Sequence, residues 1–216
     1  LMNPPYGGSE KNDVKSHYPA DLASSETADL FMAVILYRLR RGGRAAVVLP
    51  DGFLFGSDAA KLNLKKKLLE EFNLHTIIRL PGSVFAPYTS ITTNILFFDR
   101  TGPTQDVWYY RLDMPDGYKH FSKTRPMKRE HFAPAEAWWH DRQEITENGF
   151  PKARKFSAEE LAALGYNLDQ CGIPQEEEEI LPPQELIRRY EEQRAAMNQA
   201  IDRILDEIAR RLGGRP

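Results

Sequence analysis

The residues best suited to chemistry lie near the start of the sequence, where Asn3-Pro4-Pro5-Tyr6 precedes two glycines. A planar amine, such as the exocyclic nitrogen of a nucleobase, is a poor nucleophile because its lone pair is delocalised into the ring. The Asn3 side-chain oxygen and the Pro4 carbonyl can both accept its N–H bonds, which localises the lone pair on nitrogen. Pro5 stiffens the loop, and neither proline brings an N–H donor that would compete for these acceptors. Tyr6 offers a ring face on which an unstacked base can lie, although the same residue types are also typical of an ordinary loop.

The composition is that of a globular protein with no strong general attraction to nucleic acid. The chain has 216 residues, of which 41% are hydrophobic and 28% charged, and its formal net charge is −2. Any DNA contact therefore needs a local basic patch or a partner subunit. The single cysteine, Cys171, excludes an internal disulfide and suits a reducing compartment. The longest apolar stretch, residues 30–39, is too short to span a membrane and nothing resembles a signal peptide, so we expect a cytoplasmic protein, with no metal site.

Hydrophobic periodicity and turn residues predict an α/β protein. Helices are expected at residues 26–41 and 57–72, because apolar side chains recur at helical spacing and Gly42-Gly43 stops the first helix. Short apolar runs between turn residues predict four strands, at residues 44–50, 75–80, 93–99 and 107–112. Helices that alternate with continuous apolar strands favour a sheet that is covered by helices on both faces.

Three loops are expected to meet at one edge of this sheet, namely residues 3–6, 50–56 and 81–88. In sheets of this kind, the ligand lies beyond the carboxyl ends of the strands. Aromatic side chains from these loops can therefore wall a base pocket, and the candidates are Tyr6, Phe85 and Tyr88, with Phe53 and Phe55 as further possibilities. The loop aromatics after residue 50 are equally compatible with ordinary core packing.

Basic and aromatic residues alternate in the segment that follows residue 114. The candidate contacts to a DNA backbone are Lys119, Lys123, Arg125, Lys128 and Arg129. The alternative, which we favour, is a solvated irregular segment that is pinned by its aromatic side chains. Trp138-Trp139 is expected to pack without any chemical role. Ser157 and Glu160 form a capping-box pattern that predicts a short helix, which Gly165 would end.

The last predicted element is a helix over residues 184–212, in which no helix breaker occurs. Its apolar residues recur at alternating steps of three and four and form a narrow stripe, made of Ile187, Tyr190, Met197, Ile201, Ile204 and Ile208. Such a stripe is typical of a coiled coil or helix bundle, which favours docking on a partner chain or self-association over packing on its own domain. The predicted domains are residues 1–113, a connecting region at 114–181 with a short helix, and the helix at 182–216.

Several motifs together resemble a known family. Asn3-Pro4-Pro5-Tyr6-Gly7-Gly8 is followed by the helix at 26–41, by Pro50-Asp51-Gly52, and later by Leu80-Pro81-Gly82 and Thr92-Thr93-Asn94. Tyr166-Asn167-Leu168-Asp169 and the terminal helix complete the pattern. In this order they resemble the modification subunit of type I restriction–modification systems, an N6-adenine DNA methyltransferase, over nearly the whole chain.

The resemblance implies a fold, a cofactor and partners. The fold would be part of a Rossmann-like methyltransferase sheet that ends in an antiparallel hairpin, supplied here by Ile77–Leu80 and Thr93–Asp99. The methyl donor would be S-adenosylmethionine and the substrate adenine N6 in DNA. The C-terminal helix would dock on a specificity subunit, which reads the DNA sequence, and a restriction subunit would complete the system.

One departure from the family pattern limits what this chain is expected to do. The glycine-rich cofactor loop of the family precedes the Asn-Pro-Pro-Tyr motif, and this sequence holds no Gly-x-Gly. We therefore expect the cofactor residues upstream of Leu1 and no cofactor binding or turnover by this chain alone. Two alternatives remain open: methylation of another planar nitrogen, in an RNA base or a protein glutamine, and a non-catalytic assembly module.

Overall fold

The computed structural model describes residues 1–147 and 149–172, and further on residues 187–188, 190–191, 194–195, 197–199 and 201–205. Contacts divide the chain into two compact units, Leu1–Ile173 and Pro174–Pro216. The helices of the first unit are α1 (Asn12–Lys15), α2 (Thr27–Arg38), α3 (Asp51–Phe55), α4 (Ala59–Glu71), η1 (Arg129–Phe132, 3-10), α5 (Ala133–His140) and α6 (Ala158–Ala163). Its strands are β1 (Arg44–Pro50), β2 (Asn73–Arg79), β3 (Thr93–Asp99), β4 (Asp106–Arg111), β5 (Ile145–Glu147) and β6 (Phe150–Ser157).

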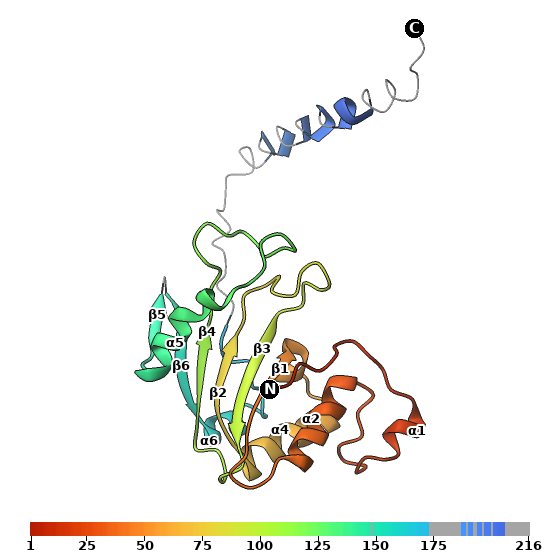
Figure 1. Cartoon of the computed structure of the whole chain (residues 1–216), viewed down its shortest axis with the longest axis vertical. Coiled ribbons are helices and arrows are strands. Elements are labelled where there is room, and N and C mark those ends of the chain that lie inside the picture. The colour runs from red at the N-terminus through yellow and green to blue at the C-terminus, as the bar shows by residue number, and fades with distance from the viewer. Residues whose placement is uncertain are drawn as a thin grey trace. The chain divides into compact units, whose positions relative to one another are not determined.

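The strands form one sheet in the order β1-β3-β2-β4-β6-β5 (Figure 1). β3 runs antiparallel to both of its neighbours, so β1 and β2 run in the same direction. β4 pairs parallel to β2, whereas β6 pairs antiparallel to β4 and to β5. The expected antiparallel hairpin of β2 and β3 is confirmed, with Ile77 opposite Leu96. The carboxyl ends of β1, β2 and β4 consequently share one edge of the sheet, which we call the rim.

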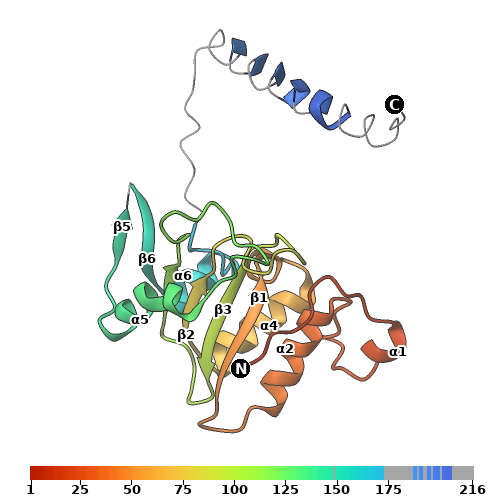
Figure 2. The ribbon, with the colours of Figure 1, turned by 45° about the horizontal axis from the view of Figure 1, so that its top comes forward.

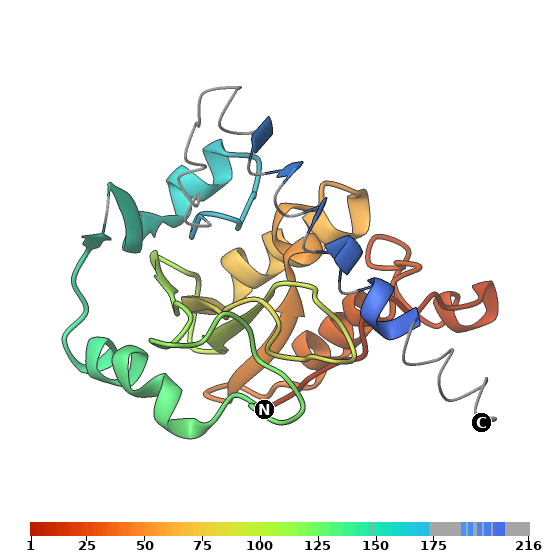
Figure 3. The same ribbon diagram turned by 90° about the horizontal axis from the view of Figure 1, so that it is seen from above.

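Alternating side chains place two hydrophobic cores on the two faces of the sheet. Ile77 and Tyr109 belong to the core that also contains residues of α2, α4 and α6. Their chain neighbours Ile78 and Tyr110 belong to the second core, which α5 covers with Trp138. Figure 3 shows α5 on the opposite side of the strands from α4 and α6. The predicted α/β sheet with helices on both faces is confirmed.

Most predicted elements are present, and the exceptions have local causes. The helices expected at 26–41 and 57–72 appear as α2 and α4, and the capping box of Ser157 and Glu160 opens α6. The turn expected after Pro50 instead winds into α3. The region from residue 114 contains α5 and the β5–β6 hairpin, which composition did not predict. The outer strands are short or rich in charge, so β6 reads as polar and lacks the apolar run that marks a buried strand.

The described residues of the second unit are helical, as the sequence predicts for this stretch. The side chains of its apolar stripe are exposed, at 58% for Ile187 and 67% for Met197. Ile208 and both predicted ends of this helix, at 184 and 212, lie outside the described residues. Among the described helices, none is long and apolar enough to cross a membrane.

Candidate active site

Backbone pairing places the Asn3–Tyr6 motif at the rim. Met2 pairs parallel with Val47 of β1: its N–H donates to the Ala46 carbonyl at 2.9 Å, and the Val48 N–H donates to the Met2 carbonyl at 3.0 Å. Figure 2 shows the N-terminus lying beside β1. Because this pairing is parallel, Asn3 leaves the sheet at the same edge as the carboxyl ends of the strands, as the sequence predicts.

Asn3 presents its side chain at the surface, with its amide oriented by a neighbour. The residue is exposed, whereas Pro4 is buried. The Tyr6 hydroxyl donates a short hydrogen bond to Asn3 Oδ1, and it also lies 3.4 Å from the Val48 carbonyl oxygen. Burial raises the pKa of Tyr6 to about 12, so this hydroxyl keeps its proton. The contact identifies the Asn3 oxygen as an acceptor that is held in place and still reachable from solvent.

Of the candidate base-pocket residues, the structure brings Tyr6 and Phe85 together. Their ring centroids lie 6.1 Å apart at 69°, in an edge-to-face arrangement. Tyr88 is 89% exposed and Phe55 57% exposed, so neither forms a packed wall. Phe53 is 1% exposed and belongs to the core, as the alternative reading had it. The assignment of Tyr6, Phe85 and Tyr88 to a base pocket remains a prediction.

A buried polar network, which the sequence did not reveal, ties the rim together. Arg79, at the end of β2, contacts two carboxylates through Nη2: Asp51 Oδ1 at 2.9 Å and Asp169 Oδ1 at 2.5 Å. Asn94 at the start of β3 donates to the same Asp51 oxygen at 2.5 Å. The Arg79 side chain is only 4% exposed. The network joins α3, two strands and the Tyr166–Asp169 motif, which lie far apart in the sequence.

A buried lysine forms hydrogen bonds to the backbone at the end of α3. Lys65 of α4 donates from Nζ to the carbonyl oxygens of Leu54 at 3.0 Å and Gly56 at 2.7 Å. These carbonyls lie at the end of α3, where backbone acceptors have no helical partner. Burial lowers the pKa of Lys65 to about 8. The rim loop after β1 is thereby held at both ends, by Lys65 and by Arg79.

The five candidate DNA-contacting side chains, Lys119, Lys123, Arg125, Lys128 and Arg129, are all exposed. Their segment is anchored by aromatic packing around Phe121, which is 1% exposed. Tyr118 packs on Phe121 and lies under the Arg125 guanidinium, whose carbon is 4.0 Å from the ring centroid. This arrangement agrees with the favoured interpretation of a solvated segment that is pinned by its aromatics. Contact with DNA remains a prediction.

One hydrogen bond links this basic segment to the loop that carries Phe85. The Phe121 N–H donates to Ser83 Oγ at 2.8 Å. Ser83 has a φ of 63°, which non-glycine residues seldom adopt. The contact chain runs from Asn3 through Tyr6 and Phe85 to the loop at Ser83 and on to the basic segment. The candidate residues of the motif and the basic segment therefore share one end of the unit.

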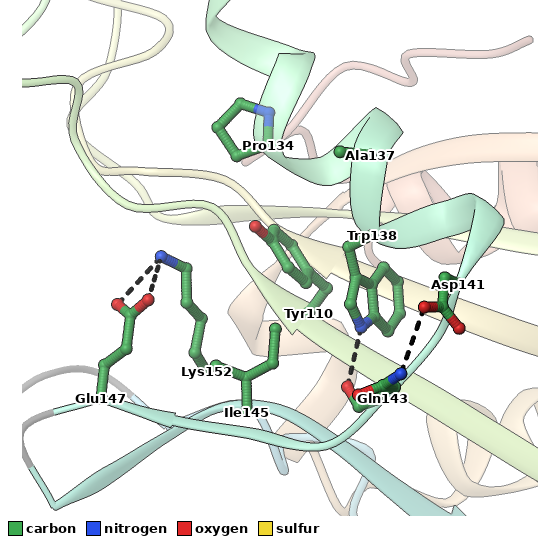
Figure 4. A pocket seen from close by; sticks show the side chains of 9 residues that line it. All are labelled: Tyr110, Pro134, Ala137, Trp138, Asp141, Gln143, Ile145, Glu147 and Lys152. Carbon is green, nitrogen blue, oxygen red and sulfur yellow. Dashed lines mark hydrogen bonds and ion pairs between the residues drawn. The ribbon is translucent and has the colours of Figure 1, made fainter.

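A pocket of about 350 Å³ lies elsewhere, between α5, β4 and the β5–β6 hairpin (Figure 4). None of the predicted site residues lines it; its walls are Tyr110, Pro134, Ala137, Trp138, Asp141, Gln143, Ile145, Glu147 and Lys152. Most of its polar groups bond to one another: Lys152 Nζ lies 2.8 Å from Glu147 Oε1, and the Trp138 indole donates to the Gln143 carbonyl at 2.9 Å. We call this region the corner.

The described residues do not by themselves fit S-adenosylmethionine. They contain no Gly-x-Gly loop, and the acidic side chains at the rim, Asp51 and Asp169, are engaged with Arg79. In each of these carboxylates the Oδ1 oxygen is bound within the network around Arg79.

The mixed sheet with an Asn-Pro-Pro-Tyr loop at its rim has the architecture of part of a Rossmann-like methyltransferase fold. Comparison with known proteins specifies the family: residues 1–180 match the family model described as N-6 DNA Methylase, and the chain belongs to this family. The methylase subunit of the type I restriction enzyme EcoEI from Escherichia coli is 44% identical over 99% of this chain. The EcoKI methylase subunit from Escherichia coli K12 is 34% identical over 62% of this chain.

Solved structures give the same result. A structure from a study of complex assembly and conformational transition in a type I restriction–modification system aligns with a TM-score of 0.68 and 33% identity, covering 100% of this chain and 45% of that one. The methyltransferase subunit of the type I system of Streptococcus thermophilus aligns with a TM-score of 0.61 and 29% identity, over 78% of this chain and 36% of that one. The chain spans 44% of the EcoEI subunit and 26% of the EcoKI subunit, so it corresponds to less than half of either.

Proposed function

We propose that this chain is part of a type I modification subunit that transfers a methyl group from S-adenosylmethionine to N6 of adenine in DNA. The observation that carries the proposal is the placement of Asn3: an exposed amide oxygen, held as an acceptor by Tyr6, at the carboxyl-end rim of a sheet. The family match and the 44% identity to the EcoEI subunit support it.

In this proposal the rim prepares the amine and the cofactor supplies the methyl group. The adenine amine donates to Asn3 Oδ1 and to the Pro4 carbonyl, which draws the nitrogen toward tetrahedral geometry. Pro5 stiffens the loop and the Tyr6 ring stacks on the extruded base, with Phe85 packed edge-to-face against it. A strong general base is unnecessary, because the amine becomes cationic and acidic once methylated.

We further propose that the cofactor loop lies in a segment upstream of Leu1. The chain covers only 44% of the EcoEI subunit, which is compatible with such a segment. The second unit would dock on a specificity subunit, with the restriction subunit joining the assembly. The exposed apolar stripe at Ile187, Met197 and Ile201 supports a protein partner for this unit. Self-association of the isolated chain through the same stripe is a corollary, which light scattering after size exclusion would measure.

The decisive experiment uses this chain extended by its upstream coding sequence, together with its specificity subunit. Duplex DNA, RNA and a glutamine-containing peptide are each incubated with labelled S-adenosylmethionine, and the products are digested and analysed by mass spectrometry. N6-methyladenine from duplex DNA alone is the expected product. Methylated glutamine or RNA would replace the proposal by the corresponding alternative.

The cofactor assignment has a separate test. A thermal-shift titration with S-adenosylmethionine is expected to stabilise the extended protein and to leave the 216-residue chain unchanged. Saturable stabilisation of the short chain would show that its own residues hold the cofactor.

A further inference from the structure

The parallel pairing of Met2 with β1 stops where the next two N–H donors of the ladder would belong to prolines, Pro4 and Pro50. Met2 lies opposite Val47, donates to Ala46 and accepts from Val48. Two residues further along both strands, the same pattern would place Pro4 opposite Leu49. The N–H of residue 4 would then donate to the Val48 carbonyl, and the N–H of residue 50 would donate to the residue 4 carbonyl. Proline occupies both positions, so neither donor exists.

The backbone of β1 confirms which way residue 50 faces. Ala46 and Val48 exchange hydrogen bonds with Met2 on the side of β1 away from β3. Asp51, an odd-numbered neighbour, donates to the Thr92 carbonyl on the β3 side at 3.1 Å. Since alternate residues of a strand turn their backbone groups to alternate sides, the nitrogen of Pro50 faces the side where Pro4 follows Met2.

The two absent donors leave two carbonyls available, and both belong to the site. The Val48 carbonyl receives the Tyr6 hydroxyl at a long 3.4 Å in place of a strand N–H. No hydrogen bond within the described part of the chain ends on the Pro4 carbonyl, although Pro4 itself is buried. The Pro4 carbonyl is the second acceptor that the proposed chemistry requires.

We propose that Pro50 is a positioning residue that keeps the Pro4 carbonyl free for the substrate amine by withholding a strand N–H. This inference rests on the proposed function. Any other residue at position 50 would bring a donor at the place where the register directs it toward Pro4, and the pairing of Met2 with β1 would extend by one bond. That bond would consume an acceptor that the amine needs.

The test compares Pro50→Ala with a matched variant in the extended protein. Pro50→Ala is expected to lower kcat for adenine methylation roughly 3- to 10-fold, the range set by one competing net hydrogen bond, with cofactor affinity not reduced and Tm no lower than that of Pro103→Ala. Replacing Pro50 by lactic acid through an ester linkage supplies the alanine side chain without an N–H and is expected to restore kcat. Pro103→Ala, in the exposed loop before β4, controls for loss of a proline.

Each result decides the role of Pro50. Full activity of Pro50→Ala, equal impairment of the ester variant, or a larger fall in Tm for Pro50→Ala than for Pro103→Ala would overturn it, the last because the proline would then be holding the fold. Hydrogen exchange gives a readout that needs no turnover: the new amide at position 50 is expected to be protected, and fast exchange would show that it reaches no acceptor. Absence of methylation by the wild-type protein would instead contradict the proposed function. The exchange measurement would still report whether the new amide at position 50 forms a hydrogen bond.

Discussion

The rim and the corner of the same sheet differ in whether their polar groups have hydrogen-bond partners within the protein. At the corner, a pocket of about 350 Å³ is lined by aromatic rings, and Lys152 is paired with both Glu147 and Asp113. At the rim, Arg79 forms ion pairs with Asp51 and Asp169. The Asn3 side chain is exposed there, and the Pro4 carbonyl receives no hydrogen bond from the described residues. The pocket at the corner therefore lies where the polar groups are bonded to one another, whereas the available acceptors lie at the rim.

Under the proposed function, the chemistry lies at the rim, where acceptors are available, and not at the pocket of the corner. A reaction needs hydrogen-bonding groups that are free to contact the substrate. At the corner, Lys152 donates to both carboxylate oxygens of Glu147, so these groups already have partners within the protein. The rim separates the two tasks. Its buried network around Arg79 supplies rigidity, and the adjoining loop supplies acceptors.

The largest expected effect comes from removing the charge at the centre of the rim. Arg79→Met leaves Asp51 and Asp169 without their buried partner and is expected to cost about 3 kcal/mol of unfolding free energy, measured by urea denaturation. Arg111→Met is the matched control, because Arg111 lies opposite Arg79 in the parallel register and contacts a single carboxylate, Asp113. An equal loss of unfolding free energy in both variants would show that the network around Arg79 adds no stability beyond that of a single ion pair.

Asn3→Ala is expected to abolish most methylation while the fold persists. Loss of one oriented group that acts on the reacting atom typically costs about 100-fold or more in kcat, and Asn3 is exposed, so its truncation leaves no cavity. Single-turnover methylation of the extended protein measures the loss, and calorimetry with S-adenosylmethionine supplies the control. If cofactor affinity falls in proportion, Asn3 has a structural role.

Tyr6→Ala is expected to weaken binding of the extruded adenine by about 1–3 kcal/mol, the usual contribution of one stacked base. Fluorescence of 2-aminopurine at the target position reports the extrusion. Tyr6→Phe retains the ring and its edge contact with Phe85 while it removes the bond to Asn3 Oδ1, so it separates stacking from orientation. Base binding that is insensitive to both changes would argue against a stacking role.

The smallest effect is expected at the corner. Lys152→Met breaks an ion pair whose partner Glu147 is 47% exposed, and should cost less than about 1 kcal/mol of stability with methylation unchanged. Denaturation and the same single-turnover assay measure both quantities. A clear loss of methylation would move the functional site toward the pocket and reverse the comparison.

Elements with strong local signals were predictable from the sequence. Apolar runs defined β1 and β3, helical spacing defined α2 and α4, and the pattern of Ser157 and Glu160 defined the start of α6. The hairpin of β5 and β6 was missed because its strands are short or charged and take their order from pairing with β4. α5 was missed because Trp138 and Trp139 are weak helix formers, and packing of Trp138 on Tyr110 stabilises them there.

The sequence by itself determined the chemical types at the site, because Asn, Pro and Tyr carry their acceptor, rigid φ and ring wherever the chain places them. It also determined the local elements, since periodicity and capping act over a few residues. Only the tertiary structure decided that Arg79 meets Asp51 and Asp169, that Tyr6 meets Asn3 and Phe85, and that Pro50 follows the register of Met2. Apart from the local pair of Tyr6 and Asn3, these contacts join residues far apart in the chain, and sheet pairing, which has no short-range signature, sets which of them become neighbours.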